Sequence, residues 1–202
     1  RFARTTSRRS FLEALRSLLH RSLVENFAQE KQTGGFGLQN VVTEFLTDYL
    51  ITQICQEFAT RTPALLHSHA LISTQAKEYV RQSQERIILQ PIGERLLATY
   101  GRTQLVAQGK ELLDALRRDR PLQPSFLAGN LLNLFLHLGI DLRGYDFSQL
   151  CIWQAYLRGA DLAGLNFSHA DFTGSVFTDY AGAVTAVAFS PDGQLLAAGA
   201  DS

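Results

Sequence analysis

Residues 141–180 read DLRGY DFSQL CIWQA YLRGA DLAGL NFSHA DFTGS VFTDY, and this stretch decides the fold of the later part of the chain. It divides into blocks of five residues, and the second residue of every block is large and apolar. Neither an α-helix nor a β-strand repeats every five residues. We therefore predict a coil in which each block forms one face and turns this residue inward. The predicted core residues are Leu142, Phe147, Ile152, Leu157, Leu162, Phe167, Phe172 and Phe177.

The residue two places before each core position is small or apolar in most blocks, so each block buries an apolar pair only by stacking on its neighbours. The segments Ala160–Leu162, Leu165–Phe167 and Ala170–Phe172 resemble the A-(D/N)-L-x-x pattern of the pentapeptide-repeat family. The resemblance implies a short right-handed, four-sided β-solenoid over residues 140–180. The helix expected just before it would cap one end.

Four blocks begin with aspartate, and one carries the chain's tryptophan. Asp141, Asp146, Asp161 and Asp171 are expected to accept hydrogen bonds from the backbone at the corners of the coil, which is a structural role. Trp153 follows a core position, in a slot that faces outward. Two interpretations remain open for its indole: an exposed interaction surface, or a side chain that packs on a neighbouring loop.

The last residues alternate in the manner of strands. Residues 184–189 and 195–199 predict a hairpin around the turn Ser190-Pro191-Asp192-Gly193. The string VTAVAFSPDGQLLAAGADS resembles the first half of a WD repeat, with Asp201 at the position of that family's structural aspartate. We expect residues 181–202 to open a propeller blade that is incomplete here, and further blades to follow in a longer protein.

Before residue 140 the apolar residues recur at helical spacing. Residues 1–42 predict a helix capped by Ser10, then strands at 21–25 and 36–42, an order that resembles the end of a winged-helix unit. Residues 43–139 predict a helical spacer domain. Its helices are expected to begin at Thr43 and near Pro63, and to span 74–89, 91–100, 103–118 and 125–138. The fold class is α+β, mainly helical in the N-terminal two-thirds.

This order of units resembles bacterial signal-transduction NTPases of the NB-ARC (STAND) kind, in which a phosphate-binding domain, a winged helix, a helical spacer and a repeat sensor follow one another. The resemblance implies that the chain is an internal part of a longer protein. In that family a histidine of the winged helix senses the nucleotide; the aligned position here is Gln39, which donates a hydrogen bond but carries no switchable charge. Gln39 is the one candidate cofactor-binding residue, and ATP or ADP would belong to the upstream part of the parent protein.

Composition and motif searches argue against an independent enzyme. Lysine and arginine balance aspartate and glutamate, 19 against 19, so no overall basic field for nucleic acid exists. The two cysteines, Cys55 and Cys151, form no CxxC pair. The sequence contains no phosphate-loop, G-x-S-x-G or HExxH motif. We predict no catalytic residue, no metal ligand and no bound cofactor, and we expect a cytoplasmic protein that does not enter a membrane.

The sequence favours a non-enzymatic linker and scaffold. It would couple an upstream nucleotide-binding core, which it contacts within the same chain, to a downstream WD-repeat propeller that binds protein partners. Two alternatives stay open: a winged-helix regulator that binds DNA, and a pentapeptide-repeat inhibitor that mimics DNA. The second of these needs a long acidic coil, which this sequence does not provide.

Overall fold

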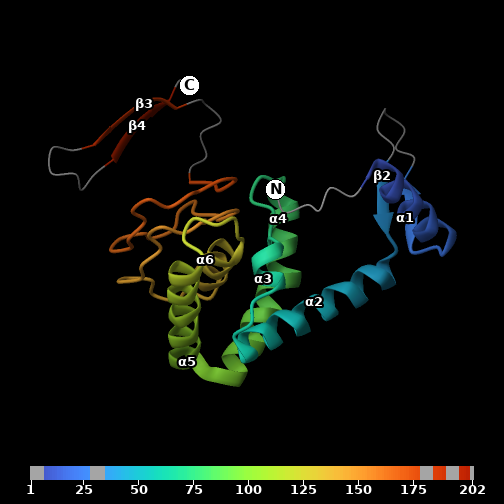
Figure 1. The fold of residues 1–202 in the computed structure, drawn as a ribbon, viewed down its shortest axis with the longest axis horizontal. Coiled ribbons are helices and arrows are strands. Elements are labelled where there is room, and N and C mark those ends of the chain that lie inside the picture. The colour runs from blue at the N-terminus through green and yellow to red at the C-terminus, as the bar shows by residue number, and fades with distance from the viewer. Residues whose placement is uncertain (1–6, 28–34, 178–183, 190–195, 201–202) are drawn as a thin grey trace.

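Figure 1 shows the computed structural model of the chain, which describes residues 7–27, 35–177, 184–189 and 196–200. Helices dominate this part of the chain, and the strands named in it form two separate antiparallel pairs. The predicted turn at residues 190–193 and the predicted role of Asp201 lie outside the described residues.

The N-terminal unit is a helix followed by two paired strands. Helix α1 spans Arg8–His20, strand β1 spans Val24–Phe27 and strand β2 spans Gly35–Leu38. The predicted cap at Ser10 is wrong by one turn, because the Oγ of Ser7 accepts a hydrogen bond from the backbone N–H of Ser10 at 3.1 Å. The strands pair antiparallel with Val24 opposite Leu38, so the start of β1 lies beside the end of β2.

Helix α2, Asn40–Thr60, begins three residues earlier than the sequence predicts. The predicted strand at 36–42 is wrong beyond Leu38, since β2 ends there and Gln39 already occupies the N-cap of α2. Val41 and Val42 are β-branched and favour strands locally. Here they continue the helical i, i+4 spacing of Phe45 and Leu46, and that longer pattern prevails. The predicted domain boundary between residues 42 and 43 therefore falls inside a helix.

Of the helical segments that follow, α4, η1 and α5 run on from one another without a gap. Helix α3 spans Leu65–Ser68, α4 spans Glu78–Gln84, the π-helical turn η1 spans Glu85–Leu89 and α5 spans Gln90–Asp119. The predicted break before Pro91 is wrong, because Pro91 lies in the first turn of α5, where its missing N–H is tolerated. The predicted break at Gly101 is confirmed as a kink with φ +69°, and the bend is visible in Figure 1.

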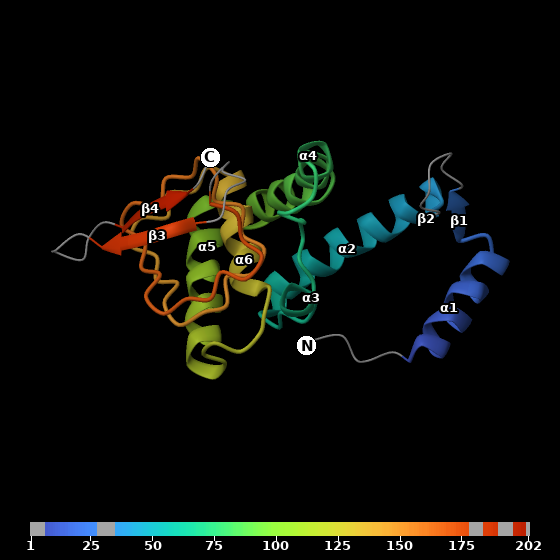
Figure 2. The same cartoon turned by 90° about the horizontal axis from the view of Figure 1, so that it is seen from above.

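Helix α6, Leu127–His137, is the centre of the molecule. It ends before Gly139, whose φ of +59° stops the helix as predicted. Residues 127–135 are all buried, because α5 covers one side of α6 and the repeat segment covers the other (Figures 1 and 2). One apolar core therefore runs from the helices into the repeats. The domain boundary predicted at residue 139 marks a change of backbone pattern and not a gap in packing.

Residues 140–177 wind as a coil with a strict backbone period. The fourth residue of each of seven consecutive blocks has a positive φ, which turns the chain at every corner. These residues are Gly144, Gln149, Gln154, Gly159, Gly164, His169 and Gly174. Parallel bridges join Asp146 to Asn166, Cys151 to Asp171 and Tyr156 to Val176. Partners twenty residues apart mean that four blocks complete one turn of this coil.

Strands β3, Val184–Phe189, and β4, Leu196–Ala200, pair antiparallel after the coil. The pairing is interrupted between Val184 and Ala186. Of the described strands, these two pair only with each other.

Candidate functional site

The junction between α6 and the coil is held by polar contacts that are shielded from solvent, and the two backbones approach very closely there. A Cβ atom added at Gly129 would lie 1.9 Å from the backbone oxygen of Trp153. Only glycine allows the helix and the coil to come this near. The indole of Trp153 also packs edge-on against Phe126, with ring centroids 5.6 Å apart.

Asn133 joins α6 to the coil by two hydrogen bonds. Its Nδ2 donates to the backbone oxygen of Gln154 at 2.7 Å, and its Oδ1 accepts from the backbone N–H of Tyr156 at 2.8 Å. The residue is 4% exposed. A buried amide with both ends satisfied fixes the register of the coil against the helix.

A second link connects the loop before α4 to two turns of the coil. The backbone N–H and the Oγ1 of Thr74 both donate to Oε1 of Gln154, at 3.0 and 2.9 Å. Thr74 Oγ1 also lies within hydrogen-bond distance of the backbone oxygen of Gly174. Gln154 belongs to one turn and Gly174 to the next, so the loop binds both turns at one point.

Arg81 is the buried charge of the junction. It forms ion pairs with Glu78 and Glu85, and its guanidinium lies 3.7 Å from the centre of the Tyr156 ring. Burial acts to lower the pKa of Arg81, but the two glutamates outweigh burial and raise this pKa above its ordinary value. The arginine therefore stays charged and connects α4 and η1 to the coil.

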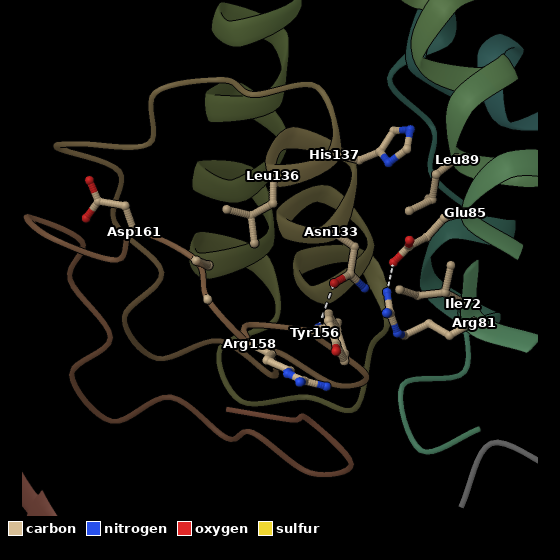
Figure 3. A pocket seen from close by; sticks show the side chains of 12 residues that line it. Ile72, Arg81, Glu85, Leu89, Asn133, Leu136, His137, Tyr156, Arg158 and Asp161 are labelled. Carbon is tan, nitrogen blue, oxygen red and sulfur yellow. Dashed lines mark hydrogen bonds and ion pairs between the residues drawn. The ribbon is translucent and has the colours of Figure 1, made fainter. Parts of the chain in front are cut away.

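A pocket of about 410 Å³ lies beside these contacts (Figure 3). Its walls come from α4, η1, α6 and the coil, and charges of both signs occur in them. The labelled side chains are Ile72, Arg81, Glu85, Leu89, Asn133, Leu136, His137, Tyr156, Arg158 and Asp161. Arg81 and Glu85 face one another in this view, and Asn133 points at Tyr156. The pocket is thus bordered by the same polar side chains that hold the junction.

The predicted core residues point into the coil to different extents. Leu142, Phe147, Ile152 and Leu157, in the first turn, are at most 3% exposed. Leu162, Phe167 and Phe172, in the second turn, are half-buried, and Phe177 is 45% exposed. Helix α6 covers the first turn, whereas the second turn packs mainly on the first. Phe147, Phe167, Phe172 and Phe177 form a continuous row of ring contacts.

The structure places the Trp153 indole against neighbouring segments. Its Nε1 donates to Oδ2 of Asp171 at 2.7 Å, and its ring packs on Phe126. These contacts favour the packed interpretation of this indole, since the residue is half-buried and joins two turns of the coil to the chain before α6. Asp171 lies one turn further along the coil. The outward-facing position of Trp153 is therefore partly covered by the next turn and by Phe126.

The four aspartates have the structural role that the sequence predicts. A side-chain oxygen of each accepts a hydrogen bond from the backbone N–H two residues later, at 2.9 to 3.0 Å, in the blocks that begin with Asp141, Asp146, Asp161 and Asp171. Cys151 is buried beside Asp171, and burial raises the pKa of its thiol. This thiol is therefore protonated and poorly nucleophilic at neutral pH.

Gln39 lies far from the junction, at the N-cap of α2. Its backbone N–H donates to the oxygen of Leu23 at 3.4 Å, and its side chain forms no cap hydrogen bond. Among the described residues no three histidine, cysteine, aspartate or glutamate side chains gather in a way that could hold a metal ion. No helix within that same part of the chain is long and apolar enough to cross a membrane.

The residues that build the junction were not recognised in the sequence. Asn133 interrupts a strongly apolar helix, and a polar amide inside such a helix is a signal for a buried hydrogen bond. Arg81 has glutamates three residues before and four residues after it, a spacing that predicts ion pairs on one helix face. Nothing in the sequence shows that both residues meet the coil.

The comparison with protein families agrees with the period of the coil. The family model for pentapeptide repeats matches residues 140–179 with eight copies. The match supports the pentapeptide-repeat content that the sequence predicts for this segment.

A relative supports the remaining repeat content. The chain is 38% identical, over 224 aligned residues, to an uncharacterized WD repeat-containing protein of Nostoc sp. strain PCC 7120. The alignment covers 94% of this chain and 17% of that protein, so the chain spans about a sixth of the relative's length. No solved structure matches the chain.

Proposed function

We propose that these residues form a non-enzymatic linker and scaffold of a longer cytoplasmic signalling protein. In this proposal they couple an upstream nucleotide-binding core of the NB-ARC (STAND) kind to a downstream WD-repeat propeller that binds protein partners. The core would act through the α1–β1–β2 unit, as the end of a winged helix, and any ATP would bind there and not to this segment. Neither a membrane nor a nucleic acid is expected as a partner.

The observation that carries the proposal is the two-sided character of α2. The second half of this helix buries Ile51, Ile54 and Phe58 in the core. Val42, Phe45 and Tyr49 lie nine residues before these, about two and a half helical turns, and so occupy the opposite face. Phe45 is 68% exposed and Tyr49 is 53% exposed. A helix with apolar stripes on opposite faces of its two halves is suited to join two bodies.

The junction provides the other half of the coupling. Helix α2 packs on α5 and η1, and η1 is directly continuous with α4, which carries Arg81 to the coil. A displacement of α2 would therefore be transmitted through η1 and α4 to the interface between α4 and the coil, which is closely packed and can adjust little. The pentapeptide repeats precede β3 and β4 in the sequence, and 94% of the chain aligns with a WD repeat-containing protein. This order supports transmission towards a propeller.

The proposal is tested by amide hydrogen exchange in paired variants. Ile54→Ala opens a cavity on the core face of α2 and should raise exchange in residues 140–177 as well as in α5. In an Asn133→Leu background, which removes both Asn133 hydrogen bonds to the coil, the same substitution should raise exchange in the helices alone. Tyr49→Ala, on the opposite face of α2, is the matched control and should change neither segment.

Coupling is refuted if Ile54→Ala leaves exchange in the coil unchanged in the otherwise native chain. Coupling is also refuted if Ile54→Ala raises hydrogen exchange in the coil equally in the native chain and in the Asn133→Leu background. Circular dichroism of each variant establishes that the helices are still formed.

A further inference from the structure

The exposed apolar side chains in the first half of α2 form one continuous stripe along the helix. Val41, Phe45 and Tyr49 follow one another at i, i+4 spacing and are 76%, 68% and 53% exposed. Glu44 and Asp48 run along one edge of this stripe. Glu44 has no hydrogen bond or ion pair with any described residue, and Asp48 forms an exposed ion pair with Arg95. The surface therefore combines an apolar stripe with an acidic edge.

Helix α1 carries the complementary combination. Phe11, Leu12 and Leu18 are 58%, 47% and 39% exposed, and no residue of this helix is buried. Arg9, Arg16 and His20 lie along one edge of the apolar stripe, at spacings of seven and four residues. Arg9 pairs with Glu13 of the same helix, whereas Arg16 has no ion pair among the residues that the structure describes.

The positions of these edges determine how the two helices can pair. Viewed from the N-terminus of each helix, the basic edge of α1 and the acidic edge of α2 lie on opposite sides of their apolar stripes, at about 100° per residue. Edges on opposite sides meet when two helices pack in parallel, as e and g positions do in a parallel coiled coil. Edges on the same side meet in antiparallel packing. Charge complementarity between α1 and α2 therefore requires the parallel arrangement.

One chain cannot make this arrangement by itself. The hydrogen bond from Gln39 N–H to Leu23 O and the pairing of Val24 with Leu38 hold the C-terminal end of α1 beside the N-terminal end of α2. From that corner, α1 could fold back on its own α2 only in the antiparallel direction. In the structure the two helices are separated and do not pack along their lengths (Figure 2).

We propose that the stripe of α2 is a docking site for α1 of a second copy of this chain. The two contacts are reciprocal: α1 of each copy packs parallel to α2 of the other about a twofold axis, as in other isologous dimers. Phe45 and Tyr49 meet Phe11 and Leu18, and Arg16 faces the edge of Glu44 and Asp48. This inference rests on the two-sided α2 of the proposed function, and it takes α1 of the other copy as the body that packs on the outer face of α2.

The test is the mass of the full chain by analytical ultracentrifugation across the micromolar range. The native chain should form a dimer that dissociates on dilution and weakens as salt is added. Arg16→Glu and Glu44→Arg should each raise the dissociation constant by roughly tenfold or more, because each places like charges along both copies of the contact. The double variant Arg16→Glu/Glu44→Arg restores opposite charges and should recover most of the affinity.

Arg118→Glu is the matched control, since Arg118 is an exposed arginine of α5 outside both surfaces. It should leave the dissociation constant unchanged. A monomer at every concentration would overturn the proposal, as would a dimer that is indifferent to Arg16 and Glu44. A double variant weaker than either single variant would refute the parallel pairing. These outcomes do not bear on hydrogen exchange in the coil, so this proposal and the coupling role fail separately.

Discussion

At the scale of single residues, the side chains that matter most connect backbone segments and do not perform chemistry. Asp171 receives the Trp153 indole N–H, the Thr173 hydroxyl and the Thr173 backbone N–H. Asn133 performs a similar task with an uncharged amide. Removal of Asn133 is costly because part-buried backbone groups of Gln154 and Tyr156 would lose their hydrogen bonds, and removal of Asp171 leaves the half-buried indole N–H of Trp153 without its acceptor.

The charge of Asp171 predicts a dependence of stability on acid. Burial acts to raise the pKa of Asp171, but the hydrogen bonds from Thr173 and Trp153 outweigh burial and lower this pKa below its ordinary value. The group therefore stabilises the fold above the unfolded pKa of about 3.9, and this contribution is lost as the pH falls through the lower folded value. We expect the native chain to lose more stability than Asp171→Asn between about pH 5 and about pH 3.

Urea unfolding of both proteins at the two pH values checks this prediction. Asp161→Asn is the control, because Asp161 is exposed and accepts its hydrogen bond from Ala163 alone. An equal loss of stability in the native chain and in Asp171→Asn would contradict the role given to the carboxylate.

At the scale of elements, the two halves of α2 lie in different environments. Its second half is held by the core, and its first half extends away from it (Figures 1 and 2). The π-helical turn η1 has a comparable position, since it packs against both α2 and α6. Such turns interrupt regular helices and are common at functional positions. Here η1 supplies Glu85, one of the two partners of Arg81.

The opposite faces of α2 predict opposite outcomes for matched truncations. Phe58→Ala should lower the free energy of unfolding by about 3–5 kcal/mol, because it empties a fully buried site. Tyr49→Ala, nine residues earlier, should change it by less than about 0.5 kcal/mol. Both are measured by urea unfolding at a protein concentration at which the chain is monomeric. Similar losses for both substitutions would mean that the first half of α2 is covered within one chain.

At the scale of the whole molecule, burial of the core side chains decreases along the coil from its first turn to its second. Its first turn is sealed by α6, and its second turn is half-buried. Two turns provide few stacking neighbours, so most of the stability of the coil comes from the helical side. The helices and the first turn should consequently unfold together.

The gradient predicts the effect of placing a charge at equivalent core positions. Phe147→Asp should prevent folding of the coil, because it buries an unpaired carboxylate at a site with no exposure. Phe167→Asp should destabilise to an intermediate degree, and Phe177→Asp should cost less than about 1 kcal/mol, since Phe177 is 45% exposed. Thermal unfolding measured by circular dichroism ranks the three variants. A cost that is equal at all three positions would contradict the gradient.

The sequence by itself determined the local patterns. The five-residue period identified the repeats and their inward residues, and the aspartates at the block starts were correctly read as corner hydrogen bonds. Gly139 was correctly placed at a helix end, whereas Gly101, which was expected to end a helix, marks a kink inside α5. These features depend on backbone conformation and on neighbours within a few residues, so the order of residues is sufficient to specify them.

Only the tertiary structure decided which elements touch. Trp153 was covered because Phe126 and Asp171, distant in sequence, converge on it. The junction at Arg81 and Asn133 could not be predicted because its partners lie on the coil, whose position relative to α4 and α6 no local pattern encodes.

The start of α2 was misplaced since strand propensity at Val41 and Val42 yielded to the helix that follows. The conformational preference of one residue is worth roughly tenths of a kcal/mol. The packing of one buried side chain is worth about 2–5 kcal/mol, so packing determines which preference prevails.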